Sequence, residues 1–257
     1  MTVNSTAFAD AVANQWHDLY GPSRAEVPMS VLTAAALRSR LDLSTPQHAP
    51  DGVGAFLSAQ RRVWERAAQR WPHLYHHWDQ YTDWPAWPDR EHTTSAALEL
   101  ARRLTATGVI DYLDDLTHRR DFLGGVLYRL RAPLASTGRD PLEAATMRPV
   151  HLDRDRPVRS ITLERTGTGH GLLPLLAALH EHGVDPRDLA WQLREIDQFQ
   201  AAVLCTNLAC WDVAAPRGAN VLVATGQDDD WIQAEREERA ESLQTLSMVT
   251  DLSGPCP

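Results

Sequence analysis

Apolar residues recur at helical spacing through the first half of the chain. In the segment from Phe8 to Tyr20 they fall three or four positions apart, and Gly21-Pro22 interrupts the pattern. Further helices are expected over residues 28–41, which are rich in Ala and Leu, and over 54–71, 94–107 and 111–130. We therefore predict a helical domain over residues 1–130.

One segment of this half breaks the helical pattern. Between Trp71 and Pro88 the chain contains three Trp-Pro steps. A residue that precedes proline prefers extended backbone, and tryptophan has a large apolar surface to bury. We expect an extended segment that packs over an apolar surface. The same segment holds His73, His76 and His77, but no further ligands complete a metal-binding set, so we expect no metal site.

The hydrophobic period changes in the second half. Short apolar runs suited to strands alternate with helical runs, in the order 160–163, 171–182, 190–195, 198–211 and 220–225. Such alternation predicts a parallel sheet with helical crossovers, here of no more than five strands. We therefore predict an α/β domain over residues 131–257. A charged helix is expected from Trp231 to Leu246.

A glycine loop follows the first predicted strand. It reads Thr166-Gly167-Thr168-Gly169-His170-Gly171, and about thirty residues later the second strand ends at Glu195-Ile196-Asp197. Glycines at this point let the backbone approach a ligand closely, and a carboxylate after the next strand can accept hydrogen bonds from ribose hydroxyls. The alternative is local: the glycines turn the chain, and Glu195 or Asp197 caps the next helix.

These residues also resemble a known family. The run from Thr166 to Trp211 is similar to the cofactor-binding core of adenine-specific DNA methyltransferases of the restriction-modification type, which use S-adenosylmethionine. Three pieces match in order: the glycine loop, the connection over residues 183–191, and the acidic turn with the helix after it. The resemblance implies a Rossmann-like methyltransferase fold, truncated relative to the seven strands of the family.

The resemblance also implies a cofactor site. Backbone amides of residues 167–171 would face the methionine part of S-adenosylmethionine, and Glu195, or failing it Asp197, would bind the ribose. Asp228, just beyond the third predicted strand, matches the position that contacts the adenine ring. The residues expected to bind the cofactor are therefore Thr166, Gly167, Thr168, Gly169, Gly171, Glu195, Asp197 and Asp228.

The chain departs from the family at several positions. The acidic residue that opens the loop motif aligns with Leu163, one loop glycine is replaced by His170, and the Tyr-Thr-Pro element reads Arg139-Asp140-Pro141. The catalytic Asn-Pro-Pro-aromatic motif, which grips the flipped adenine, is found nowhere in the sequence. No catalytic residue is therefore assigned.

Three functions remain compatible with this pattern. The first is a methyltransferase-like protein kept as a non-catalytic binding or regulatory module, with DNA or a protein as its partner. The second is an active S-adenosylmethionine-dependent DNA methyltransferase that obtains the missing element from a partner subunit and extrudes its target base. The third is an α/β protein with an unrelated small ligand.

The charge of the chain bears on the DNA partner. The formal net charge of −9 argues against a protein that holds duplex DNA mainly through phosphates. The segment from Arg119 to Arg165 is nevertheless net positive, with ten arginines and six acidic residues. All 25 basic residues are arginine, which indicates a compositional bias. We expect these arginines to form a solvated surface.

Composition also sets the expected environment. No apolar run among the 257 residues approaches the ~20 needed to span a bilayer, and the N-terminus has no signal-peptide pattern, so we expect a cytoplasmic protein with no membrane partner. Cys205, Cys210 and Cys256 do not form a metal-spaced set. We expect Cys205 and Cys210 to be reduced and packed in the core.

Overall fold

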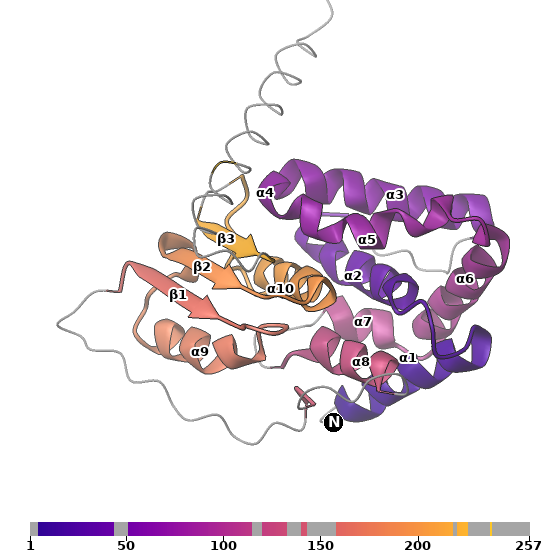
Figure 1. The fold of residues 1–257 in the computed structure, drawn as a ribbon, viewed down its shortest axis with the longest axis horizontal. Coiled ribbons are helices and arrows are strands. Elements are labelled where there is room, and N and C mark those ends of the chain that lie inside the picture. The colour runs from indigo at the N-terminus through magenta and orange to yellow at the C-terminus, as the bar shows by residue number, and fades with distance from the viewer. Residues whose placement is uncertain are drawn as a thin grey trace, which may run out of the picture.

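The computed structural model describes residues 5–43, 51–114, 120–132, 140–142, 158–217, 220–225 and 237. Within these ranges the protein is mixed α/β and mostly helical, with a small parallel sheet beside the helices (Figure 1). The longer helices before the sheet are α1 (Ser5–Leu19), α2 (Glu26–Arg40), α3 (Val53–Arg70), α6 (Arg90–Ala106), α7 (Val109–Asp114) and α8 (Phe122–Arg131).

Most of the predicted helices are confirmed, but the expected single helix over 111–130 is wrong. It is two helices, α7 and α8, because Asp121 begins a new one. The Asp121 carboxylate accepts a 2.8 Å hydrogen bond from the backbone amide of Gly124 and so caps α8. Aspartate favours this capping position because its side chain satisfies an amide that has no partner within the helix.

The expected extended course of the Trp-Pro segment is also wrong. It folds into four short helical pieces, α4 (Pro72–Tyr75), η1 (His76–Trp78), α5 (Asp79–Thr82) and η2 (Trp84–Ala86). Pro72 and Pro85 stand in the first turn of their helices, where a missing amide proton costs nothing and the fixed φ suits the helix. The packing role is confirmed, because Trp71, Trp78 and Trp84 are buried.

The sheet has three described strands, β1 (Ser160–Glu164), β2 (Ala190–Arg194) and β3 (Val221–Ala224), all parallel and ordered β1-β2-β3. The glycine loop follows β1 and ends within the helical turn η3 (His170–Leu172), which leads into α9 (Leu173–Glu181), so the predicted place of the loop between a strand and a helix is confirmed. The turn η4 (Pro186–Asp188) precedes β2, and α10 (Gln198–Cys210) joins β2 to β3. The expected helix at 231–246 lies outside the described residues.

Helix α10 is almost completely buried. Every residue from 201 to 210 is buried, including Cys205 and Cys210, so the expected core packing of these two thiols is confirmed. Trp78 reaches α10 from the helical half, and its indole Nε1 donates to the carbonyl of Ala202 and the hydroxyl of Thr206, both at 3.1 Å. Buried apolar residues from α1 to β3 form one hydrophobic cluster, so the helices and the sheet share a core.

A histidine of the helical half contacts β3 on the side away from β2. The His77 Nε2 group donates a 2.9 Å hydrogen bond to the carbonyl of Val223. This carbonyl points away from β2, because the alternate carbonyls of Asn220 and Ala224 accept the β2 amides. Burial, and next the charge of His76, hold the pKa of His77 well below its usual value, so the ring is neutral.

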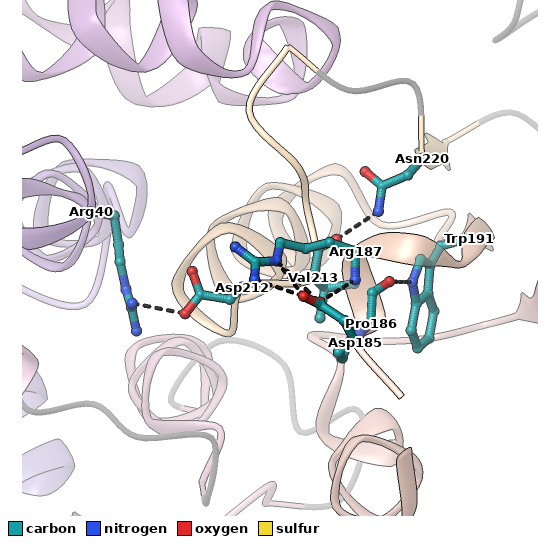
Figure 2. Close-up of polar contacts among 8 residues, drawn as sticks. All are labelled: Arg40, Asp185, Pro186, Arg187, Trp191, Asp212, Val213 and Asn220. Atoms are coloured by element: carbon teal, nitrogen blue, oxygen red, sulfur yellow. Dashed lines mark hydrogen bonds and ion pairs between the residues drawn. The ribbon is translucent and has the colours of Figure 1, made fainter. Parts of the chain in front are cut away.

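The loops at the amino ends of β2 and β3 are fixed by polar contacts (Figure 2). Trp191 Nε1 donates to the carbonyl of Pro186, and Asn220 Nδ2 donates to the carbonyl of Val213, both at 2.8 Å. Arg40 of α2 forms a 2.9 Å ion pair with Asp212, just after α10. The opposite, carboxyl end of the sheet holds the glycine loop.

Candidate functional site

The glycine loop is folded back against the end of β2. The amide and the hydroxyl of Thr166 both donate to the carbonyl of Arg194, at 3.1 and 3.0 Å. Gly167 and Gly169 have φ angles of +57° and +97°, which disfavour residues that carry a Cβ. A Cβ on Gly169 would also lie only 2.9 Å from Leu204 Cδ1. Gly171 has neither constraint.

Glu195 holds this loop from the end of β2. Its Oε2 accepts a 2.7 Å hydrogen bond from the amide of Gly167, and its Oε1 accepts a 3.0 Å bond from the amide of Asp197. The residue is only 8% exposed. Each carboxylate oxygen therefore already has a backbone donor and keeps one lone pair, which a ligand hydroxyl would have to reach.

Asp197 takes the capping role that was the alternative expectation for it. Its Oδ1 accepts hydrogen bonds from the amides of Phe199 at 2.9 Å and Gln200 at 3.1 Å, the first turn of α10. Its Oδ2 pairs with Arg131 at 2.6 Å. Burial alone would raise the pKa of Asp197, but the hydrogen bonds from Arg131 and the two amides outweigh it and hold the pKa below its usual value.

A buried polar cluster also holds the loop, at Thr168. The Thr168 hydroxyl donates to Asp121 Oδ2. Asn207 on α10 donates through Nδ2 to Asp121 Oδ1 and to the carbonyl of Thr168, both at 2.8 Å. All three side chains are buried. This cluster joins the start of α8, the glycine loop and α10.

The ionisation of Asp121 is shifted by these surroundings. Burial raises its pKa to about 6, although the hydrogen bonds from Thr168, Gly124 and Asn207 lower it and Asp140 adds to the rise. Sequence reasoning missed the cluster. An aspartate before an apolar helix is a capping signal, but Thr168 lies 47 positions further along the chain, and no local pattern connects the two.

A pocket of about 320 Å³ opens at the carboxyl ends of β1 and β2, lined by Glu164, Arg165, Arg194 and Ile196. Ile196 gives the pocket an apolar side chain that is 42% exposed. Arg194 Nη1 lies 3.4 Å from Glu164 Oε2. The volume is near the lower end of the ~300–1,000 Å³ typical of small-molecule sites. None of these four lining residues was among the residues expected to bind the cofactor.

The structure thus gathers most of the expected site at one end of the sheet. Thr166, Gly167, Thr168, Gly169 and Gly171 form the loop, and Glu195 and Asp197 follow β2, next to Ile196 of the pocket. Asp228 lies outside the described residues. The histidines at 73, 76 and 77 belong to no metal-binding group, since the described residues contain no cluster of three or more His, Cys, Asp or Glu side chains suited to a metal ion.

Comparisons with known proteins identify no family for this chain. No protein-family model matches the chain, and no curated protein or solved structure matches it either. Among the helices in the described ranges, none has the length and apolar character needed to cross a bilayer.

Proposed function

We propose that this chain is a non-catalytic relative of the adenine-specific DNA methyltransferases, with a Rossmann-like fold that binds S-adenosylmethionine and acts as a binding or regulatory module. The observation that carries the proposal is the glycine loop, clamped to Glu195 through the amide of Gly167, beside an open pocket at the carboxyl ends of β1 and β2. Ligands of parallel α/β sheets bind outside the carboxyl ends of the strands.

The chemistry of the pocket supports a ligand with an aromatic ring and a carboxylate. The exposed face of Ile196 offers apolar surface against which a planar adenine ring can pack. Arg165 contributes a guanidinium group to the pocket, and guanidinium groups bind carboxylates through paired hydrogen bonds, whereas Arg194 already pairs with Glu164 at 3.4 Å. S-adenosylmethionine carries both groups.

The absence of catalysis follows from the missing Asn-Pro-Pro-aromatic motif. The amino nitrogen of adenine is a poor nucleophile, since its lone pair is delocalised into the ring. Methyl transfer therefore needs acceptors that hold the amino group and a pocket that stacks the extruded base. The family supplies both through this one motif, which the sequence lacks.

A protein is favoured over duplex DNA as the partner of this module. Arg129 and Arg131, two of the ten arginines in the net-positive segment, form ion pairs within the chain, Arg129 with Asp10 and Asp140 and Arg131 with Asp197. Their charge is thus neutralised in place. Together with the net charge of −9, this reduces the basic surface that phosphates would require.

Calorimetric titration of S-adenosylmethionine tests the proposal. The parent chain should bind, and Ile196→Asp should weaken binding at least about tenfold, because a carboxylate replaces the apolar surface under the ring. Val53→Asp is a matched control, since Val53 is 40% exposed at the start of α3. A parent chain that shows no binding at about 1 mM ligand would overturn the proposed function.

A further inference from the structure

We propose that Asp121 is a positioning residue for the glycine loop: from outside the loop it holds Thr168 and so fixes the backbone of the loop, which follows directly after Arg165 of the pocket. The contact between Asp121 and Thr168 is seen in the structure itself. The identity of the ligand that the loop would bind rests on the proposed function.

Asp121 collects hydrogen bonds from three separate elements. Oδ1 accepts from the amide of Gly124 in α8 and from Asn207 Nδ2 in α10, each at 2.8 Å, and Oδ2 accepts from the hydroxyl of Thr168 in the loop. Asn207 also donates to the carbonyl of Thr168 at 2.8 Å. A cap alone would use one oxygen and its own helix. Here the second oxygen is directed to a segment 47 positions away.

Gly124, in the first turn of α8, has no space for a side chain between Asp121 and Thr168. A Cβ added to Gly124 would overlap both Asp121 Oδ2 and Thr168 Oγ1. The helix and the loop therefore approach each other so closely that only glycine fits at this position. The close approach is what lets a side chain at the start of α8 reach the loop.

The loop needs this fastening because of its own composition. Gly167 and Gly169 flank Thr168, and each has a positive φ. Glycine has the largest conformational freedom to lose, so this segment would populate many backbone states without tertiary contacts. Glu195 holds Gly167 and Asp121 holds Thr168, so two successive residues are held by different elements, the end of β2 and the start of α8. A loop ordered before binding lowers the entropy that a ligand must overcome.

The fastening by Asp121 depends on its protonation state. The charged and titratable groups of the surrounding elements are Asp140, which raises the pKa of Asp121, Arg129 of α8, which pairs with Asp140 at 2.8 Å, and His170 of the loop, whose pKa is lowered by burial. Asn207 of α10 is neutral. Because burial raises the pKa of Asp121 to about 6, opening of the loop that hydrates Asp121 becomes easier as the pH rises through this value.

Hydrogen exchange of the full chain tests the role of Asp121. After correction for intrinsic rates, the opening constant of the amides at 167–171 should rise at least about tenfold between pH 4 and pH 7 in the parent. The neutral, nearly isosteric Asp121→Asn should lose this dependence, and Asp121→Ala should open the loop at every pH. Asp185→Asn is a control cap, since Asp185 caps η4 at the other end of the sheet.

The outcomes separate this inference from the proposed function. If Asp121→Ala does not fold, Thr168→Val still removes the hydroxyl that reaches Asp121 and should raise loop exchange, while Thr168→Ser should restore protection. An Asp121→Asn loop with the same pH dependence as the parent would overturn the inference. Absence of S-adenosylmethionine binding by the parent would overturn the proposed function and leave the exchange result valid.

Discussion

The carboxylate of Glu195, at the end of β2, accepts a 2.7 Å hydrogen bond from the backbone amide of Gly167 in the loop after β1. Glu195, the residue expected to bind ribose, thus already uses one lone pair of Oε2 to accept a hydrogen bond from the loop. Under the proposed function the same side chain would hold the loop and contact the ligand, so we expect a change at Glu195 to alter both stability and binding.

Glu195→Ala should lower the free energy of unfolding by about 1.5–3 kcal/mol, the range for hydrogen bonds to a charged group. The amides of Gly167 and Asp197 both lose their acceptor. Urea unfolding of parent and variant measures the difference. Calorimetry on the same pair should show S-adenosylmethionine binding weakened by a similar amount. Unchanged stability would mean that the clamp contributes nothing.

The glycines of the loop should differ in their tolerance of alanine. Gly169→Ala should destabilise the protein by about 1–3 kcal/mol, because it places a Cβ at φ +97° and against Leu204. Gly171→Ala should stay within about 0.5 kcal/mol, since no atom lies within 4 Å of the added Cβ. Thermal unfolding of the two variants side by side checks this. Equal losses would show that the loop does not adopt this backbone.

Asp121 should give the parent a stability component that falls with rising pH. Its pKa in the folded protein is raised from 3.8 to about 6, so the folded state holds a proton that the unfolded state has released. The stabilisation is fully present below about pH 4 and is lost as the pH rises through about 6. Subtracting the unfolding free energies of Asp121→Asn from those of the parent across pH 4–7 isolates this component. A flat difference would contradict it.

The contribution of Asp197 to stability should increase with rising pH, opposite to that of Asp121, because the pKa of Asp197 is lowered in the folded protein. Its stabilisation is present above the pKa of the unfolded chain and is lost as the pH falls. Asp197→Ala should cost about 0.5–2 kcal/mol at neutral pH through the lost cap. Asp197→Asn keeps a capping oxygen and loses only the ion pair with Arg131, so it should cost less. Chemical unfolding at pH 7 compares them, and equal costs would assign the whole effect to the ion pair.

The parts of this fold that depend on local sequence could be predicted. Apolar residues on one helical face predicted α1 and α3, and Ala and Leu content predicted α2. The position of the glycine loop between a strand and a helix followed from the alternation around it. The Trp-Pro segment was misjudged because proline suits the first turn of a helix as well as an extended chain. The start of α8 is marked by a single capping aspartate, Asp121, which the hydrophobic period alone does not reveal.

The candidate site was predictable only in part, for a different physical reason. Residues that are adjacent in sequence, such as Glu195 and Asp197, could be assigned to the end of a strand. Which way a carboxylate points could not, because the donor for Glu195 lies 28 positions before it. The contact between Asp121 and Thr168 joins residues 47 positions apart through a close helix-to-loop approach that exists only in the folded chain.

The most direct test of the central claim follows radiolabelled S-adenosylmethionine through one incubation with the purified chain and genomic DNA that lacks adenine methylation. We predict that the protein retains the labelled cofactor in equilibrium dialysis and that no label enters the DNA above the level of a Gly169→Asp control. Gly169→Asp should also lose cofactor retention, because the larger side chain meets Leu204 and distorts the loop. Label incorporated into DNA, or a parent chain that retains no cofactor, would contradict the account.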